Sequence, residues 1–539
     1  MKFPVKDSLT EEELKSGLKN VIMDGLTTHA MATLTGGVFL VAFALKLGAS
    51  NLTIGILAAI PPLGQLIQIP AIYIVEKYRN RRDICIVSTA ASRSFWLLIA
   101  LIPFLYFIKI PLALLIIALA LNSAFSSIGG CSWNSWMRDL VPVNQMGSFF
   151  GKRMVYASIV GILFSIVAGI FIDYWKQLYP DRELYAYSYI FIAGFLAGMF
   201  GLYFLSKTPE PRMVVLKEKV NFYRLLLQPF KDPNFKNLIF FLSSWNFAVN
   251  LAAPFFTVYM LKRLNLDMST IIILMVLNQV VSIAFLNLWG KYSDRFSNKS
   301  ILSINGPLFI VCILAWTFTA RPEKYILTMP LLVIIHALMG ISSAGITLSS
   351  GNIGLKLAPK GQATSYLAAS SFVNSLAAGI APVLGGLFAD FFEKTHIETI
   401  INWGSPIGTG GFYALYFRSL DFFFLFAFLI GFYSIHRLAL VKEVGEVEEK
   451  IVVNELISEV RRDMRTFSTA SGLRSMVQFP YSILIDTIEN VRVLTNFKSS
   501  LSNLNRRRVI KTTMFKSAFK KRLKSTSRGE TPEKINKTL

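Results

Sequence analysis

Amide, hydroxyl and imidazole side chains recur inside long apolar stretches of this chain, one helical turn apart. His29 and Thr33 are four residues apart, and Asn246 and Asn250 follow with the same spacing 217 positions later. Side chains at this spacing share one face of a helix. These groups donate and accept hydrogen bonds. The pattern predicts recognition of a small molecule through hydrogen bonds.

Other polar side chains lie in comparable apolar surroundings. Polar groups are costly in lipid, so they usually face a cavity or another helix. The candidate solute-binding residues are His29, Thr33, Gln65, Gln68, Asn122, Asn246, Asn250, Asn278, Gln279, His336 and Asn374. For each of them, a hydrogen bond that ties two helices together is the alternative.

Bond-making chemistry has little support in the sequence. No P-loop, nucleophile elbow or metal-binding pair of histidines is present. The three cysteines, Cys85, Cys131 and Cys312, form neither a disulfide framework nor a zinc spacing. The sequence therefore predicts a protein that is not an enzyme and that uses no cofactor or metal.

Few charged side chains fall deep inside the apolar stretches. Asp24, Asp173 and Asp390 stand near their ends, and Arg93 is the one base at depth. Proton-coupled carriers usually use a buried carboxylate, so coupling to protons stays open. Arg93 suits an anion, but an arginine can also bond helix carbonyls or extend to the membrane surface.

The elements that position these groups are apolar helices. Of the residues 53% are hydrophobic, and Phe alone counts 44. A stretch of about 20 apolar residues crosses a bilayer core of roughly 30 Å. We predict twelve spans, at 23–46, 52–75, 84–106, 110–136, 153–173, 187–206, 237–260, 269–289, 300–320, 326–349, 366–390 and 415–438.

The second half of the chain repeats the first. Residues 169–173 (Gly-x3-Asp) return as 386–390, again 217 positions later, and Glu76 corresponds to Asp294. A unit of this length is not a solenoid repeat. It indicates two six-helix halves in the same orientation, around a site near the middle of the membrane.

Basic residues set the predicted orientation. Lys and Arg concentrate in the loops after the second, fourth and eighth spans and in the linker between the halves. By the positive-inside rule both termini are cytoplasmic. The first 21 residues lack the apolar segment of a signal peptide. The fold class is thus an all-α, multi-pass protein of the cell (inner, cytoplasmic) membrane with twelve transmembrane helices.

Five segments follow from this reading. They are a cytoplasmic N-terminal helix at 1–21, a six-helix half at 22–206, a cytoplasmic linker at 207–236, a second six-helix half at 237–440 and a tail at 441–539. The tail becomes strongly basic from Arg492 onward, within a formal net charge of +23. We expect it to bind anionic lipids at the inner leaflet rather than nucleic acid.

One loop motif carries a family resemblance. Gly290, Asp294, Arg295 and Phe296, followed by Asn298 and Lys299, form a Gly-x3-Asp-Arg-Phe turn between spans eight and nine. With twelve spans in two halves, this resembles the major facilitator superfamily over about residues 20–440. The first-half copy departs from the signature at Glu76, Lys77 and Arg79.

The resemblance implies a gate at the cytoplasmic side. In that family the loop residues hold the cytoplasmic gate shut, and we carry this role onto Glu76, Lys77, Arg81, Gly290, Asp294, Arg295 and Lys299. The alternative is that these charges only orient the helices.

The function expected from these observations is secondary transport by alternating access. The partner would be a small solute, neutral and polar or amphipathic, held between aromatic walls such as Trp245, Phe255, Phe256 and Tyr259. The alternative is a sensor or scaffold that kept the fold without transport, which the long tail and the irregular first loop motivate. The oligomeric state stays open.

Overall fold

The computed structural model of the chain describes residues 9–105, 110–142, 145–213, 227–320, 323–359, 363–405, 408–446, 451–452 and 454–455. The chain divides into one compact unit at 1–452 and a second at 453–539. Predictions for the first eight residues, for the middle of the linker and for the tail beyond residue 455, including its basic end, lie outside the described residues.

The first half consists of helices joined by short turns. Its elements are α1 (Glu11–Thr35), α2 (Gly37–Lys46), α3 (Asn51–Gly64), η1 (Gln65–Ile67), α4 (Gln68–Tyr78), α5 (Arg81–Leu101), η2 (Ile102–Phe104), α6 (Pro111–Leu140), α7 (Met146–Leu178), η4 (Pro180–Arg182) and α8 (Glu183–Ser206).

The second half repeats this order and adds one hairpin. Its elements are η5 (Gln228–Lys231), α10 (Pro233–Val258), the π-turn η6 (Tyr259–Arg263), α11 (Met268–Arg295), α12 (Asn298–Ala315), η7 (Trp316–Phe318), α13 (Thr328–Leu357), α14 (Ala363–Phe391), β1 (His396–Ser405), β2 (Gly408–Arg418) and α15 (Leu420–Ala439). In the described part of the chain, twelve helical segments are long and apolar enough to span a membrane. The twelve predicted spans are confirmed.

The first span differs from its prediction in two ways. Thr10 caps α1 in a reciprocal capping box with Glu13, and the helix then runs without interruption to Thr35. From Glu11 onward, the predicted N-terminal helix and the first span are one continuous helix. The span is also broken, because Gly37 has a φ of +53° that an L side chain rarely adopts. α2 therefore starts as a new helix.

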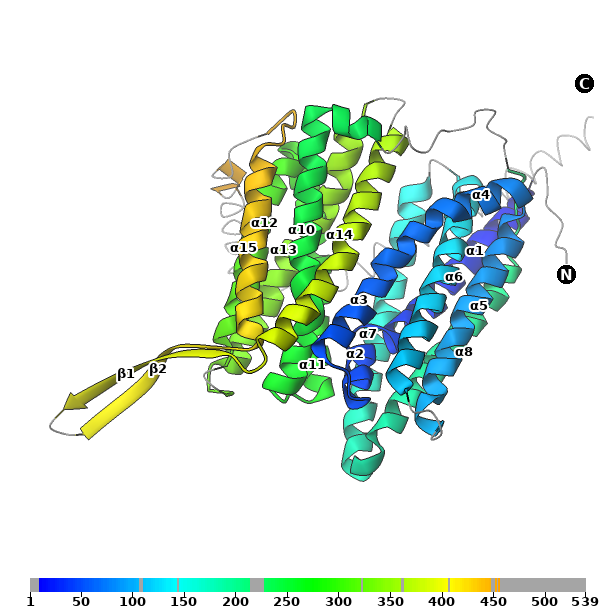
Figure 1. Cartoon of the computed structure of the whole chain (residues 1–539). Helices are drawn as coiled ribbons and strands as arrows, with labels where there is room; N and C mark the ends of the chain where they lie inside the picture. Colours follow the sequence, from blue (N-terminus) through cyan, green and yellow to red (C-terminus); the bar gives the residue numbers. More distant parts are fainter. Residues whose placement is uncertain are drawn as a thin grey trace, which may run out of the picture. The chain divides into compact units, whose positions relative to one another are not determined.

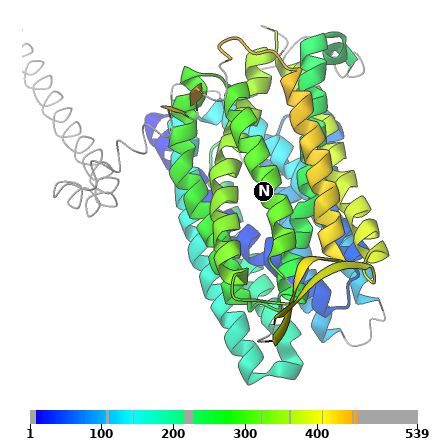
Figure 2. The ribbon, with the colours of Figure 1, turned by 90° about the vertical axis from the view of Figure 1, so that its left-hand side faces the viewer.

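Each half packs as a bundle, and the halves meet mainly along two helix pairs, with a smaller contact between α10 and α2. α3 packs against α14, and α7 packs against α11. Figures 1 and 2 show the two halves, with the first-half helices in blue and cyan and the second-half helices in green to orange. We call the end where α1 begins and α15 ends the proximal end, and the opposite end, where α3 and α11 begin, the distal end.

A hairpin at the distal end was not predicted. β1 and β2 pair antiparallel with a register shift between Thr399 and Ile400, and Figure 1 shows the hairpin extending away from the helices. Ile397 lies between His396 and Glu398, but Ile400 and Ile401 are adjacent, so the alternation that would predict a strand is interrupted.

Candidate functional site

The break in the first span lies beside a cavity of about 200 Å³. Polar lining comes from His29 and Thr33 of α1, Ser165 of α7 and Gln279 of α11. α1 and α7 belong to the first half and α11 to the second. Three predicted site residues, His29, Thr33 and Gln279, are thus brought together between the halves.

A glycine on α7 lets this polar face form. A Cβ at Gly161 would lie 2.7 Å from Cδ2 of His29 and 3.0 Å from Oγ1 of Thr33. A real Cβ atom essentially never comes closer than 3.0 Å to such a neighbour, so a larger residue at Gly161 would displace the imidazole. At the break, Gly36 provides no side-chain cap for α2. The first N–H groups of α2 therefore have no intrahelical partner, and Gly37, Val38 and Phe39 line the same cavity.

The other predicted solute-binding residues bond elsewhere. Asn122 donates to the carbonyl oxygen of Ser92 at 2.8 Å and joins α6 to α5. Asn278 donates to the carbonyl oxygen of His336 at 3.1 Å and joins α11 to α13. These bonds match the helix-tie alternative.

The remaining candidates form local hydrogen bonds. His336 is buried, with its Nδ1 2.8 Å from the carbonyl oxygen of Leu332. Gln68 donates to Gln65 one turn away. Asn374 donates to Oγ of Ser370 at 3.4 Å.

Asn246 and Asn250 lie away from their predicted partners. Each donates to its own helix, to the carbonyl oxygens of Leu242 at 2.7 Å and Asn246 at 2.8 Å. Neither lines the cavity around His29. α1 breaks at Gly36, whereas α10 continues unbroken to Val258.

The predicted aromatic walls are core packing instead. Trp245, Phe255 and Tyr259 are buried. The Phe255 ring meets that of Phe423 with centroids 4.9 Å apart, and Phe256 stacks on Trp316 at 4.7 Å. Phe255 and Phe256 hold α10 against α15 and η7, and none of the four lines the cavity around His29.

A buried charge cluster joins four helices of the first half, α1, α5, α7 and α8. Arg93 on α5 donates to Oγ1 of Thr28 at 2.7 Å, to Oδ1 of Asp24 at 3.4 Å and to the carbonyl oxygen of Gly198. Arg153 on α7 approaches Oδ2 of Asp24 at 3.9 Å. Asp24 and Arg93 are both under 5% exposed, so Arg93 contacts its own bundle and not the cavity.

Sequence reasoning missed the role of Asp24. It placed this acid at the end of a span, whereas α1 starts at Glu11 and has Asp24 near its middle. The sequence feature that could have predicted this role is the presence of one acid and one base, Asp24 and Arg93, inside apolar stretches. Lone intramembrane charges usually find a partner of opposite sign.

The predicted gating residues lie at the proximal end and divide into two groups. Glu76, Lys77, Asp294 and Arg295 are exposed, and Gly290 is half-buried. Arg81 and Lys299 are buried and bond within their own halves. Their gating role stays a prediction.

In the first half, an acid after α8 anchors the start of α5. Glu210 accepts from the backbone N–H of Arg81 at 2.8 Å and of Arg82 at 3.2 Å. The Arg81 guanidinium also pairs with Asp139 at the end of α6. A carboxylate at a helix N-terminus is favourable because the helix dipole is positive there.

The second half repeats this anchor at the start of α12, 217 residues after the start of α5. Glu443, after α15, accepts from the N–H of Lys299 at 2.7 Å and from Nδ2 of Asn298 at 3.0 Å. Lys356 of α13 lies 2.8 Å from the same carboxylate. The two anchors tie the ends of each six-helix half to the start of its third span.

The bonds of Glu443 should make the free energy of unfolding depend on pH. Burial alone would raise the pKa of this carboxyl, but bonds from Lys356, Lys299 and Asn298 bring the pKa below its usual 4.5. A lowered folded-state pKa stabilises the fold above the unfolded-state value. Glu443→Gln is expected to lower the free energy of unfolding by about 1–3 kcal/mol at pH 7. The difference from the unsubstituted protein should shrink as pH falls below 4.5.

Thermal unfolding of the purified protein at pH 7 and pH 4 measures this effect. The matched control is Glu446→Gln, because Glu446 pairs with Lys299 at 2.6 Å while 43% of its side chain stays exposed. Exposed pairs contribute only about 0–1 kcal/mol. Equal losses in the two variants would show that the buried carboxylate has no special weight.

Comparisons with known proteins agree on one family. The sequence profile described as Major Facilitator Superfamily matches residues 25–382. An uncharacterized MFS-type transporter, YxiO of Bacillus subtilis (strain 168), is 25% identical over 197 residues, or 36% of this chain. The match spans 42% of that relative's length.

Solved structures share the fold at low sequence identity. The nucleoside transporter NupG superposes with a TM-score of 0.57 at 13% identity, covering 80% of this chain and 99% of its own. A bacterial homologue of the iron transporter ferroportin in an inward-facing state gives 0.55 at 12% identity, covering 81% and 100%. A bacterial homolog to the human lysosomal transporter Spinster, inward-facing and unoccupied, gives 0.53 at 15%, covering 71% and 84%.

Proposed function

The chain belongs to the major facilitator superfamily of membrane transporters, and we propose on this premise that it moves a small, neutral polar solute by alternating access. Its two six-helix halves would rock about a central site. The proposed location is the cell (inner, cytoplasmic) membrane, with both termini on the cytoplasmic side.

The cavity at the break in α1 carries this proposal. Both halves contribute to its lining, as a site at the centre of a rocking pair requires. Its thirteen lining residues include polar His29, Thr33, Ser165 and Gln279 but no Asp, Glu, Lys or Arg. Its 200 Å³ is small beside the range of about 300–1,000 Å³ usual for ligand sites. These features favour a compact, uncharged solute with several hydrogen-bonding groups.

The arrangement of the halves supports an inward-facing state. α3 packs closely on α14 near the distal end, while Glu76 and Asp294 are exposed at the proximal end. With cytoplasmic termini, the proximal end faces the cytoplasm. Two of the similar structures are themselves described as inward-facing.

Two substitutions in the cavity test the site. A thermal-shift screen of the purified protein against neutral solutes first identifies a ligand, because binding to the folded state raises the melting temperature. Thr33→Val and Gln279→Leu are then each expected to weaken binding and labelled uptake about tenfold, through loss of a hydrogen bond worth about 1.5 kcal/mol.

The matched control is Asn250→Leu, because Asn250 bonds its own helix. It should leave affinity unchanged. The reverse outcome, with Asn250→Leu harmful and both cavity variants neutral, would move the site to α10. If no solute class is ever bound or moved, a sensor or scaffold on this fold is favoured.

A further inference from the structure

We propose that Asp173 and Asp390 form a reciprocal latch that holds the distal end closed and sets the balance between the two transport states. This inference rests on the proposed function. It concerns the acid that ends each Gly-x3-Asp segment of the sequence repeat, for which neither the cavity nor the proximal anchors give a use.

Asp390 of the second half caps a helix of the first half. Its Oδ1 accepts from the backbone N–H of Asn51 and its Oδ2 from that of Leu52, both at 3.0 Å. These are the first two residues of α3. Both carboxylate oxygens are thus bound to N–H groups that have no partner within the helix.

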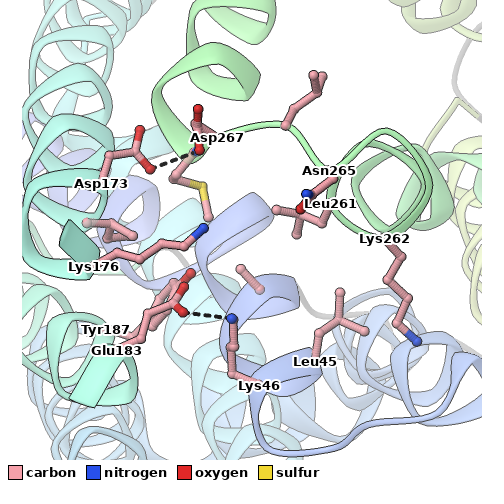
Figure 3. A pocket seen from close by; sticks show the side chains of 14 residues that line it. Leu45, Lys46, Asp173, Lys176, Glu183, Tyr187, Leu261, Lys262, Asn265 and Asp267 are labelled. Atoms are coloured by element: carbon pink, nitrogen blue, oxygen red, sulfur yellow. Dashed lines mark hydrogen bonds and ion pairs between the residues drawn. The ribbon is translucent and has the colours of Figure 1, made fainter. Parts of the chain in front are cut away.

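Asp173 of the first half caps a helix of the second half in the same way. Its Oδ1 accepts from the N–H of Met268 at 3.0 Å and its Oδ2 from that of Ser269 at 2.7 Å. α11 has its own acid at the N-cap position, Asp267, which makes no capping hydrogen bond. Figure 3 shows Asp173 reaching this helix start from the facing helix. The partner half has therefore replaced the local cap.

The glycine four residues before each acid brings the helices together. A Cβ at Gly386 would lie 2.5 Å from the carbonyl oxygen of Asn51, and one at Gly169 would lie 2.9 Å from Cδ1 of Ile272. Small residues allow such close approach of membrane helices. Glycine and acid therefore act together, the first by proximity and the second by charge at a helix N-terminus.

The surroundings make the latch reversible. A hollow of about 270 Å³ lies between the halves beside Asp173, lined by charged groups that include Lys46, Lys176 and Glu183. Lys46 pairs with Glu183 at 2.7 Å, and Figure 3 shows Lys176 directed into the hollow near Asp173. On opening, water and Lys176, three residues along α7, replace the lost partners of Asp173.

The latch gives a common role to the two carboxylate caps, one on α3 and one on α11, at the contact between the halves. Each bond crosses between halves, and rocking that parts the distal end must break the Asp173 and Asp390 caps together. A charge-assisted bond to backbone N–H groups is stronger than a neutral one. Two such caps therefore bias the protein toward the state with a closed distal end.

Cysteine accessibility tests the latch without a solute. The background carries Cys85, Cys131 and Cys312 replaced by alanine, with Ala42→Cys as reporter, because Ala42 lines the hollow and is 3% exposed. A membrane-impermeant maleimide is applied to the distal face. Labelling in Asp173→Ala/Asp390→Ala is expected to rise about tenfold, with a smaller rise in each single variant.

Controls separate the latch from general damage. Asp267→Ala removes a neighbouring acid without a capping bond and should leave labelling unchanged. Asp173→Asn and Asp390→Asn keep one acceptor oxygen each, so their labelling rates should lie between those of the unsubstituted protein and the double alanine variant. These two variants replace the double variant as the test if it does not fold. Unchanged labelling in the double variant, or an equal rise in Asp267→Ala, would overturn the latch.

The outcome is independent of the transport proposal. If labelling rises but no solute is moved, the latch stands and the transporter reading fails. If solute uptake is normal and labelling is unaffected, the transporter reading stands and the latch fails.

Discussion

Replacing Arg93 with methionine is expected to lower the free energy of unfolding by about 3–5 kcal/mol, the usual cost of leaving a buried charge uncompensated. Arg93 is 3% exposed, and its guanidinium bonds Thr28, Asp24 and the carbonyl of Gly198. Without it, Asp24 keeps only Thr28 at 3.1 Å and Arg153 at 3.9 Å. Thermal unfolding of the purified protein measures the loss.

A double variant tells whether charge or packing is responsible. Asp24→Asn combined with Arg93→Met removes both charges and should recover part of the loss. Arg138→Met, at an exposed site on α6, should change stability little. A melting temperature for Arg93→Met as high as that for Arg138→Met would show that the cluster contributes nothing.

Gly55→Ala is expected to reduce solute uptake roughly tenfold or more. A Cβ at Gly55 on α3 would overlap the carbonyl oxygen of Pro382 on α14. Overpacking of this kind costs about 1–3 kcal/mol. The penalty falls on the state in which the distal end is closed, so that state loses population and the transport cycle slows.

Gly130→Ala is the matched control, because a Cβ there meets nothing within 4 Å. Both changes add the same helix propensity. A difference in uptake between the two variants therefore measures the effect on the contact between α3 and α14. Gly55→Ala should also raise labelling of the Ala42→Cys reporter. Uptake in Gly55→Ala that equals uptake in Gly130→Ala would mean that α3 and α14 do not need this contact.

The fold was largely predictable from the sequence, because membrane spans obey a length rule. About 20 apolar residues cross the bilayer whatever their partners are, and twelve such segments lie within the part of the chain that the structure describes. The break at Gly36 and Gly37 was harder to anticipate. A pair of glycines within an apolar run is also compatible with an unbroken helix, and only the positive φ of Gly37 shows the break.

The candidate site was only partly predictable. His29, Thr33 and Gln279 meet as residues of a shared cavity, but Asn246 and Asn250 bond their own helix. Sequence spacing says which side chains share a helix face, not which neighbour that face meets. The roles of Asp24 and Asp390 depend on partners far away in the chain, Arg93 and Asn51, which spacing does not reveal.

The two proximal anchors have a consequence for how the protein is made. The start of α5 needs Glu210, which comes after α8, and the start of α12 needs Glu443, which comes after α15. Domains generally fold as units, the N-terminal one first during synthesis. Each half can therefore complete its anchor only when its sixth helix and the following acid have left the ribosome. A nascent chain cut before residue 210 would contain six spans, and the start of its third helix would have only the local cap of Asn80 and not the Glu210 carboxylate.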